Sequence, residues 1–188
     1  MQLFGYTKES IEFLYWQLER HQSRITILTA TGNQQHHIHN SDELYPDAVG
    51  KHVIFYDGVC GLCNKFIQFV IDNDRNGLFF FAALQSEFAK NTLARRGANA
   101  EDLNTVYVLS NYGNGQEERL FNKSDAVAFT TSQLKPWIKP AAFFIKVFPK
   151  PLRDFGYETV AKIRYKLFGK HDQCMLPSPE TRARFIDS

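Results

Sequence analysis

The sequence has few cysteines and no apolar run of membrane-spanning length. Only three of its 188 residues are cysteines, namely Cys60, Cys63 and Cys174. A structural disulfide framework normally uses a larger, even number, so an odd set of three indicates catalysis or metal binding. The most apolar late stretch, residues 136–151, contains lysines and several prolines. It is too short to cross a bilayer, so no transmembrane segment is expected.

The chain also lacks an excess of either charge. Its 22 basic and 20 acidic residues leave a net charge of +2, which provides no electrostatic footprint for nucleic acid. The first ten residues have no basic start followed by an apolar run, so no secretory signal is expected and a cytoplasmic location is predicted. A hydrophobic content of 44% is typical of a globular protein, and 188 residues suffice for one domain with an appendage.

Residues 1–50 differ in pattern from the rest of the chain. Apolar residues recur at helical spacing within residues 7–21, at Ile11, Leu14, Tyr15 and Leu18. The segment RITILTATG, at 24–32, follows as a predicted strand. We therefore expect an α/β extension over residues 1–50 that adds strands to the core or forms a homodimer contact. The main domain is expected over residues 51–188.

From residue 51 onward, predicted strands and helices alternate. The apolar run HVIFYDG at 52–58 predicts a strand buried on both faces, and LFFFAAL at 78–84 predicts a second one. The helix between them carries Leu62, Phe66, Phe69 and Val70 on one stripe, which is expected to face the core. Together these elements form a βαβ unit with a parallel strand pair.

The following segments complete a larger α/β pattern. They predict a helix from Ser86 to Gly97, a hairpin of strands at 104–110 and 116–121, and a helix over 123–134. The order β-α-β-α-β-β-α, with the cysteine pair at the front of the first helix, is that of a thioredoxin-like core. Extra C-terminal helices are expected at 140–148, at 151–168 and shortly after Ser178.

Cys60 and Cys63 are placed for thiol chemistry. A helix N-terminus presents unpaired N–H groups and partial positive charge, and both favour the reactive thiolate form of a cysteine there. Cys60 is therefore predicted to be the nucleophile and the more exposed thiol of the pair. Cys63, one turn later, is predicted to resolve the mixed disulfide. Asp57, three residues before Cys60, either exchanges a proton with the thiols or caps the turn.

Two other interpretations of the cysteines remain. They can be two buried thiols that happen to lie three residues apart. Alternatively, Cys60, Cys63, His171 and Cys174 form a tetrahedral Cys3His zinc site, in which case the chain is a structural or interaction module. Outside such a site, Cys174 is expected to be a packed cysteine or a third redox thiol.

Several separated pieces of the chain resemble one known family. The string FYDGVCGLCNKFIQFVIDNDRNGLFFFAALQS, then SDAVAF, FPKPLRDFGYETVAKIRYKLFGKHDQC and RARF are similar to the DCC family of thiol-disulfide oxidoreductases. The family's D-x-x-C-x-x-C signature corresponds to Asp57, Cys60 and Cys63. The resemblance extends over residues 52 to about 186. It implies a thioredoxin-like, cytosolic protein that exchanges disulfides with protein or small-molecule thiols, with no cofactor expected.

The chain departs from ordinary thioredoxins in two respects. Thioredoxins place a cis-proline against the active site, just before the third strand, whereas no proline occurs here between Pro46 and Pro136. The substrate-binding backbone must therefore differ. In addition, the residues between the two cysteines are Gly61 and Leu62, so the redox potential of known CxxC enzymes does not carry over.

The C-terminal region contains several charged and aromatic residues. Arg153, Asp154, Tyr157, Arg164 and Arg184 fall in the family-like segments. Tyr157 and Arg164 are two helical turns apart and share a face. We expect these arginines to form structural ion pairs, with lowering of a thiol pKa or binding of an anionic substrate as the alternative.

The basic, aromatic segment AAFFIKVFPK, at 141–150, is expected to face the core. Docking on a partner or on a membrane surface is the alternative for this segment.

Overall fold

The computed structural model describes residues 45–171 and 178–186. The helix and strands predicted within residues 1–50 therefore lie outside the described residues. The described end of this region, from residue 45, contains a short 3-10 turn at Pro46–Ala48. The predicted domain boundary at residue 50 and the proposed homodimer contact stay predictions. Cys174 also lies outside the described residues.

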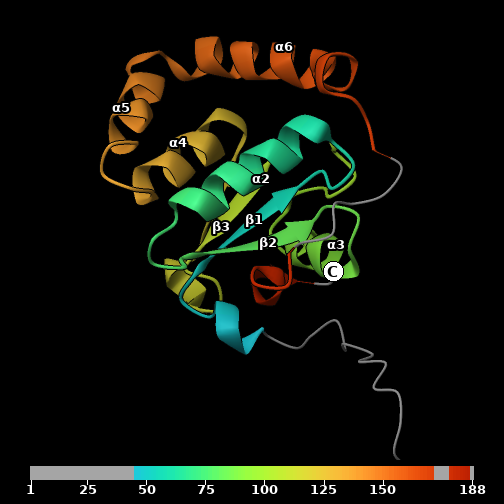
Figure 1. Ribbon diagram of the computed structural model, residues 1–188, viewed down its shortest axis with the longest axis vertical. Helices are drawn as coiled ribbons and strands as arrows, with labels where there is room; N and C mark the ends of the chain where they lie inside the picture. The colour runs from blue at the N-terminus through green and yellow to red at the C-terminus, as the bar shows by residue number, and fades with distance from the viewer. Residues whose placement is uncertain (1–44, 172–177, 187–188) are drawn as a thin grey trace, which may run out of the picture. The chain divides into compact units, whose positions relative to one another are not determined.

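A five-stranded mixed sheet forms the centre of the domain (Figure 1). Its strands are β1 (His52–Tyr56), β2 (Phe79–Ala83), β3 (Tyr107–Ser110), β4 (Arg119–Asn122) and β5 (Phe185–Ile186), in the order β4-β3-β1-β2-β5. β1 and β2 are parallel, whereas β3 pairs antiparallel with both β1 and β4. Parallel neighbours require a crossover, which is supplied by the helix between them.

Five α-helices occur in the described part of the chain. They are α2 (Gly61–Asn73), α3 (Glu87–Ala94), α4 (Lys123–Gln133), α5 (Lys139–Val147) and α6 (Lys150–Phe168). α2 and α4 cover one face of the sheet and α3 covers the other, while α6 crosses over α2 and α4 as an outer layer (Figure 1). The predicted order β-α-β-α-β-β-α is confirmed, and the fold is thioredoxin-like α/β.

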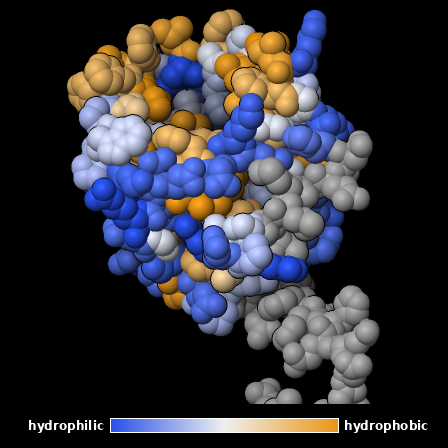
Figure 2. Space-filling model, in the orientation of Figure 1, coloured by the Kyte–Doolittle hydropathy of each residue, from blue (hydrophilic) through white to orange (hydrophobic). Residues whose placement is uncertain are grey.

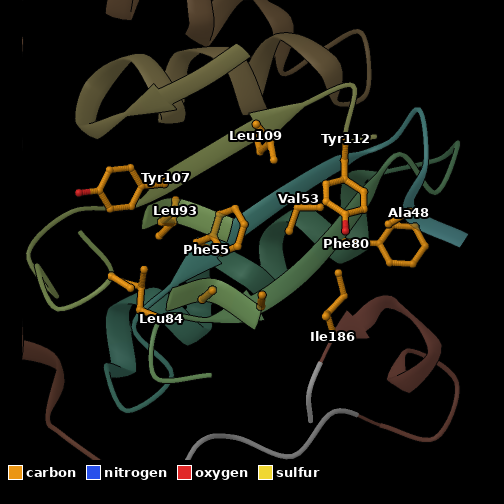
Figure 3. Packing of buried hydrophobic residues seen from close by; sticks show 13 residues of the cluster. Ala48, Val53, Phe55, Phe80, Leu84, Leu93, Tyr107, Leu109, Tyr112 and Ile186 are labelled. Carbon is orange, nitrogen blue, oxygen red and sulfur yellow. The ribbon is translucent and has the colours of Figure 1, made fainter. Parts of the chain in front are cut away.

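Strand β1 is buried on both faces because helices cover both sides of the sheet. Alternate side chains point to opposite faces, so Val53 and Phe55 enter one core cluster and Ile54 and Tyr56 the other. Figure 3 shows the first cluster, in which Phe55 lies near Leu93 of α3.

Two predictions about apolar surfaces are wrong. Phe69 does not face the core: it is 37% exposed, and the buried residues of α2 include Asn64, Ile67 and Val70. The expected stripe is displaced because Leu62 and Phe66 turn toward α6 and the cavity beneath it. The segment 141–150 does not face the core either, since Phe143 and Phe144 are 67% and 65% exposed. None of the helices in the described residues combines the length and hydropathy that a bilayer crossing requires.

The C-terminus is attached to the sheet through Asp74, which is buried. Its carboxylate accepts hydrogen bonds from the backbone N–H groups of Leu78 and Phe79, both at 3.0 Å, and forms an ion pair with Arg184. The Arg184 Nε donates to the carbonyl of Phe79 at 2.9 Å. Arg184 thus has the structural role expected of it, and its contacts hold β5 beside β2.

We predict that Arg184→Ala lowers the free energy of unfolding by about 2–4 kcal/mol, because it leaves the buried Asp74 carboxylate without its cation. Urea denaturation followed by circular dichroism measures the loss. Arg182→Ala is the matched control, since Arg182 is exposed in the same short helix and its loss should cost less than about 0.5 kcal/mol. Equal losses in the two variants would contradict the role assigned to Arg184.

Candidate active site

The loop between β1 and α2 brings Cys60 to the first turn of the helix. Cys60 is the N-cap residue of α2, with extended backbone angles, and its Sγ accepts a hydrogen bond from the backbone N–H of Cys63 at 3.4 Å. This interaction satisfies one of the N–H groups that every helix leaves unpaired at its start. The predicted position of the cysteine pair at the helix N-terminus is therefore present.

The two thiols differ in solvent exposure, and Cys63, not Cys60, is the more exposed one. Cys60 is completely buried, whereas Cys63 is half-buried and lines a cavity. The expectation that Cys60 is the more exposed thiol is wrong. The reason is a segment more than a hundred residues away in the sequence, which covers the start of α2.

That cover segment consists of residues 168–171, which begin at the last residue of α6 and continue beyond it. Its backbone pairs with the loop in antiparallel fashion at Cys60 and Lys170. The N–H of Gly61 donates to the carbonyl of Gly169 at 3.3 Å, and the N–H of His171 donates to the carbonyl of Val59 at 2.8 Å.

Gly61 is needed for this close approach. A Cβ atom on residue 61 would lie 2.3 Å from the carbonyl oxygen of Phe168, nearer than any normal contact. A glycine between the two cysteines is therefore a requirement of the covered loop.

Asp57 is buried and fully engaged by hydrogen bonds. Its Oδ1 accepts from the backbone N–H of Val59 at 3.3 Å and from the Gln85 side chain at 2.8 Å. Its Oδ2 accepts from Arg164 Nη2 at 2.9 Å and from the hydroxyl of Tyr165. The turn-capping contact is one of the two roles expected from the sequence, and the contacts with α6 add a link to the C-terminal helix.

Arg164 is the charged partner of Asp57, and both side chains are almost inaccessible to solvent, at 3% and 1% exposure. Besides Asp57, Arg164 Nη2 donates to the carbonyl of Leu103 at 2.7 Å. Burial would lower the pKa of Arg164, but the hydrogen bond to Tyr165 and the neighbouring thiols raise it overall, so the guanidinium stays charged. The expected structural ion pairing of Arg164 is present, and its partner is the signature aspartate.

The protonation of Cys63 is set by its surroundings. Burial raises the pKa of the Cys63 thiol well above its usual value, and the hydrogen bond and charge interaction with Cys60 raise it further. Arg164 acts in the opposite direction, with a smaller effect. Cys63 is therefore a thiol near neutral pH.

A cavity of about 600 Å³ lies between α6 and the layer formed by α2, α4 and α5. One end of its lining includes Cys63 and Arg164, and the other includes Arg153 and Ser124. Its walls are otherwise largely apolar, with Leu62, Phe66, Val127, Ile145, Phe148 and Val160 among them. Tyr157 and Arg164 were predicted to share one face of a helix, and both line this cavity.

The backbone before β3 borders the same cavity. Val106 lies there, and its N–H donates to the hydroxyl of Tyr157 at 2.9 Å. Burial raises the pKa of Tyr157 to about 12, so the phenol stays protonated. No peptide bond in the described residues is cis, and at the position where thioredoxins have their cis-proline the backbone is held instead by α6.

Sequence reasoning did not identify Tyr165, Gln85 or the cover segment as parts of the site. Tyr165 directly follows Arg164 in the family-like string FPKPLRDFGYETVAKIRYKLFGKHDQC, and its place in that string was its only signal. Gln85 follows β2 and reaches Asp57 only because the two parallel strands end at the same edge of the sheet.

The proposed zinc ligands are described only in part. His171 lies beside the loop through its backbone bond to Val59, but Cys174 lies outside the described residues. Within residues 45–171 and 178–186, no group of three or more His, Cys, Asp or Glu side chains is arranged to hold a metal ion.

Comparison with known proteins gives one family and two relatives. Residues 54–170 match the family model of the DCC1-like thiol-disulfide oxidoreductases. "Uncharacterized protein YuxK" from Bacillus subtilis (strain 168) is 36% identical over 141 residues, which cover 74% of this chain and 97% of the relative. "DCC family protein At1g52590, chloroplastic" from Arabidopsis thaliana is 40% identical over 124 residues, or 66% and 69% of the two chains. No solved structure matches the chain.

We predict that Gly61→Ala displaces the cover segment, because the added methyl group overlaps the carbonyl oxygen of Phe168. The free energy of unfolding should fall by about 1–3 kcal/mol, and alkylation of Cys60 should become faster. Chemical denaturation and peptide mapping after brief alkylation measure the two effects.

The control is Gly156→Ala, at a helical glycine with no atom near the position of the added methyl group. It should change stability by less than about 1 kcal/mol, in the stabilising direction, and leave Cys60 alkylation unchanged. If Gly61→Ala behaves in the same way, residues 168–171 do not protect Cys60.

We predict strong energetic coupling between Asp57 and Arg164. Asp57→Asn and Arg164→Met should each lower the free energy of unfolding by about 3–5 kcal/mol, because each leaves a buried charge without its partner. The double variant should lose much less than the sum of the two. Denaturation of all four proteins provides the cycle. Glu87→Gln, in an exposed ion pair with Lys90, is the control and should cost under about 1 kcal/mol; additive losses at Asp57 and Arg164 would contradict the coupling.

Proposed function

The chain belongs to the family of DCC1-like thiol-disulfide oxidoreductases, and from this membership we propose that Cys60 and Cys63 form its redox couple. The observation that carries the proposal is the hydrogen bond from the Cys63 backbone N–H to Cys60 Sγ at the start of α2. A thiolate accepts such a bond better than a thiol does, and the helix N-terminus favours the negative charge.

The two cysteines have different roles in this proposal. Cys60 is the nucleophile because it is the helix-capping sulfur. Cys63 is the resolving thiol, because its raised pKa keeps it protonated until Cys60 has formed a mixed disulfide. The raised value results in part from the negative charge on Cys60, so it should fall once that charge is used in bond formation.

The exchange proceeds in two steps. The Cys60 thiolate attacks one sulfur of a substrate disulfide, the substrate S–S bond breaks, and the first substrate thiolate leaves and takes up a proton. Cys63 then attacks Cys60 Sγ, the mixed disulfide bond breaks, and the second substrate sulfur leaves as a thiolate that takes up the proton lost by Cys63. The substrate gains two electrons, the protein holds a Cys60–Cys63 disulfide, and an external thiol reductant restores the dithiol.

The cavity beside Cys63 favours a substrate with an apolar body. Its two arginines, Arg153 and Arg164, each carry buried guanidinium N–H groups without a partner among the described residues. Unpaired buried donors are costly, and an acceptor oxygen on the substrate would satisfy them. The substrate class proposed is therefore a protein or small-molecule disulfide with an apolar portion and a carboxylate or carbonyl group.

Asp57 is proposed as a positioning residue. Its four hydrogen bonds occupy both carboxylate oxygens and fix the loop before Cys60 against α6. The cytoplasmic location is retained as a proposal because a free dithiol couple persists in a reducing compartment. The name of the Arabidopsis relative says that it is chloroplastic.

We predict that Cys63→Ser traps a mixed disulfide at Cys60, because the resolving thiol is lost. Dibenzoyl-cystine should react faster than diacetyl-cystine, because the two disulfides have carboxylates and similar leaving thiols but only the first has an aromatic body. Intact-protein mass spectrometry and peptide mapping identify the modified residue. Cys60→Ser should trap nothing at Cys63 on the same time scale, and Cys174→Ser should behave as the unmodified chain does.

Trapping at Cys63 instead of Cys60 would overturn the assignment of roles, and failure of the unmodified chain to form a reversible Cys60–Cys63 disulfide would overturn the couple. Elemental analysis of the same protein separates the zinc alternative, for which the backbone bond between His171 and Val59 shows only that His171 lies beside the cysteine loop. Zinc near one equivalent, with the thiols protected until a chelator is added, would replace the redox proposal with a structural metal site.

A further inference from the structure

Exposed hydrophobic side chains are concentrated on one part of the surface. All but two of the large hydrophobic residues exposed in the described part of the chain fall within residues 137–168. The two exceptions are Val49 and Phe69. Figure 2 shows an apolar patch at the top of the molecule, around a hollow. The patch lies over the region that α5 and α6 occupy in Figure 1.

Helix α6 has the reverse of the usual amphipathic arrangement. The residues Leu152, Gly156, Val160, Ile163 and Leu167 follow steps of four, four, three and four, so they form one stripe along the helix. All of them are exposed. The neighbouring stripe, which includes both Arg153 and Arg164, faces inward to the cavity and the core. The apolar stripe thus faces solvent and the arginines face the protein.

Basic residues flank the exposed stripe. Residues 137–170 contain eight basic and two acidic residues, a net charge of +6, whereas the whole chain has only +2. The two acidic residues, Asp154 and Glu158, are already paired with Lys150 and Lys123. Within this region, the exposed lysines that form no salt bridge to another described residue are Lys139, Lys146, Lys162, Lys166 and Lys170.

We propose that the surface formed by α5 and α6 docks on an anionic lipid bilayer, with both helices lying along the interface. An apolar stripe bordered by lysines is the pattern of an interfacial helix, whose apolar side chains enter the acyl boundary while the lysines contact anionic headgroups. Trp137, 68% exposed just before α5, suits the headgroup level because its ring is apolar with one polar N–H.

The charge argues against a second copy of the chain as the occupant. Two such surfaces would bring their exposed lysines together, and because the acidic residues of this region are already paired, the surfaces would repel one another if they met face to face. A neutral apolar partner would cover the stripe but give the unpaired lysines nothing to bind. An anionic bilayer satisfies the apolar residues and the lysines together.

Docking would also place the mouth of the cavity at the bilayer. Phe144, Phe148 and Val160 belong both to the exposed surface and to the cavity lining, so the hollow opens within the apolar patch. The docking itself does not depend on the proposed redox function, because it uses none of the thiols.

Vesicle flotation of the full chain tests the proposal. Vesicles of phosphatidylcholine with a third replaced by phosphatidylglycerol should bind the protein at least tenfold more tightly than vesicles of phosphatidylcholine alone. Lys162→Gln with Lys166→Gln should lower binding by roughly tenfold or more, and added salt should have a similar effect. Ile163→Ser with Leu167→Ser should also reduce it by roughly tenfold or more, since two side chains no longer enter the bilayer.

The matched controls lie elsewhere on the surface. Val49→Ser with Phe69→Ser removes the two other exposed hydrophobic residues, and Lys90→Gln removes an exposed lysine on α3; both should bind as the unmodified chain does. Circular dichroism checks that all variants are folded. The proposal fails if the chain does not bind anionic vesicles, if the two lipid compositions bind it equally, or if the α6 variants match the controls. A concentration-dependent dimer lost in the α6 variants, with no vesicle binding, would instead identify an interface between copies.

Discussion

The buried ion pair between Asp57 and Arg164 determines where the C-terminal helix lies. Asp57 follows the central strand and Arg164 belongs to the last long helix, and the two side chains meet where neither is accessible to solvent. Isolated charges cannot remain in such a place, so each requires the other. Because Arg164 must reach the end of β1, α6 has to cross over α2 and α4, and residues 168–171 are then brought onto the start of α2.

The position of α6 has consequences on both of its sides. Its inner side spans a gap that the side chains do not fill, and this gap is the cavity beside Cys63. Its outer side is left with a stripe of exposed aliphatic residues, because both arginines of the helix face inward. The same ion pair therefore explains the enclosed site and the unusual surface, since a helix that turns its arginines inward must turn other residues outward.

The two cysteines differ both in their electrostatic surroundings and in their accessibility. Cys60 has the helix N-terminus but is covered, whereas Cys63 borders the cavity but is kept protonated by burial and by its neighbour. In the proposed exchange, attack by Cys60 on a substrate disulfide requires the cover segment to move away from Cys60. The segment is held to the loop by a few backbone bonds at its own end of α6, so it is better suited to such a movement than the strands beneath it.

The sequence alone determined the elements whose signals are local. Continuous apolar runs predicted β1 and β2, Ser86 predicted the start of α3, and the CxxC spacing after a strand predicted a cysteine at a helix N-terminus, because propensity and capping depend on nearby residues. Family-like pieces predicted the fold. Only the tertiary structure decided that Asp57 pairs with Arg164, that Cys60 is covered, and that Phe69 and residues 141–150 face outward. Those features depend on which distant segments of the chain come into contact. The spacing of residues along one helix or strand does not indicate which other segment packs against it.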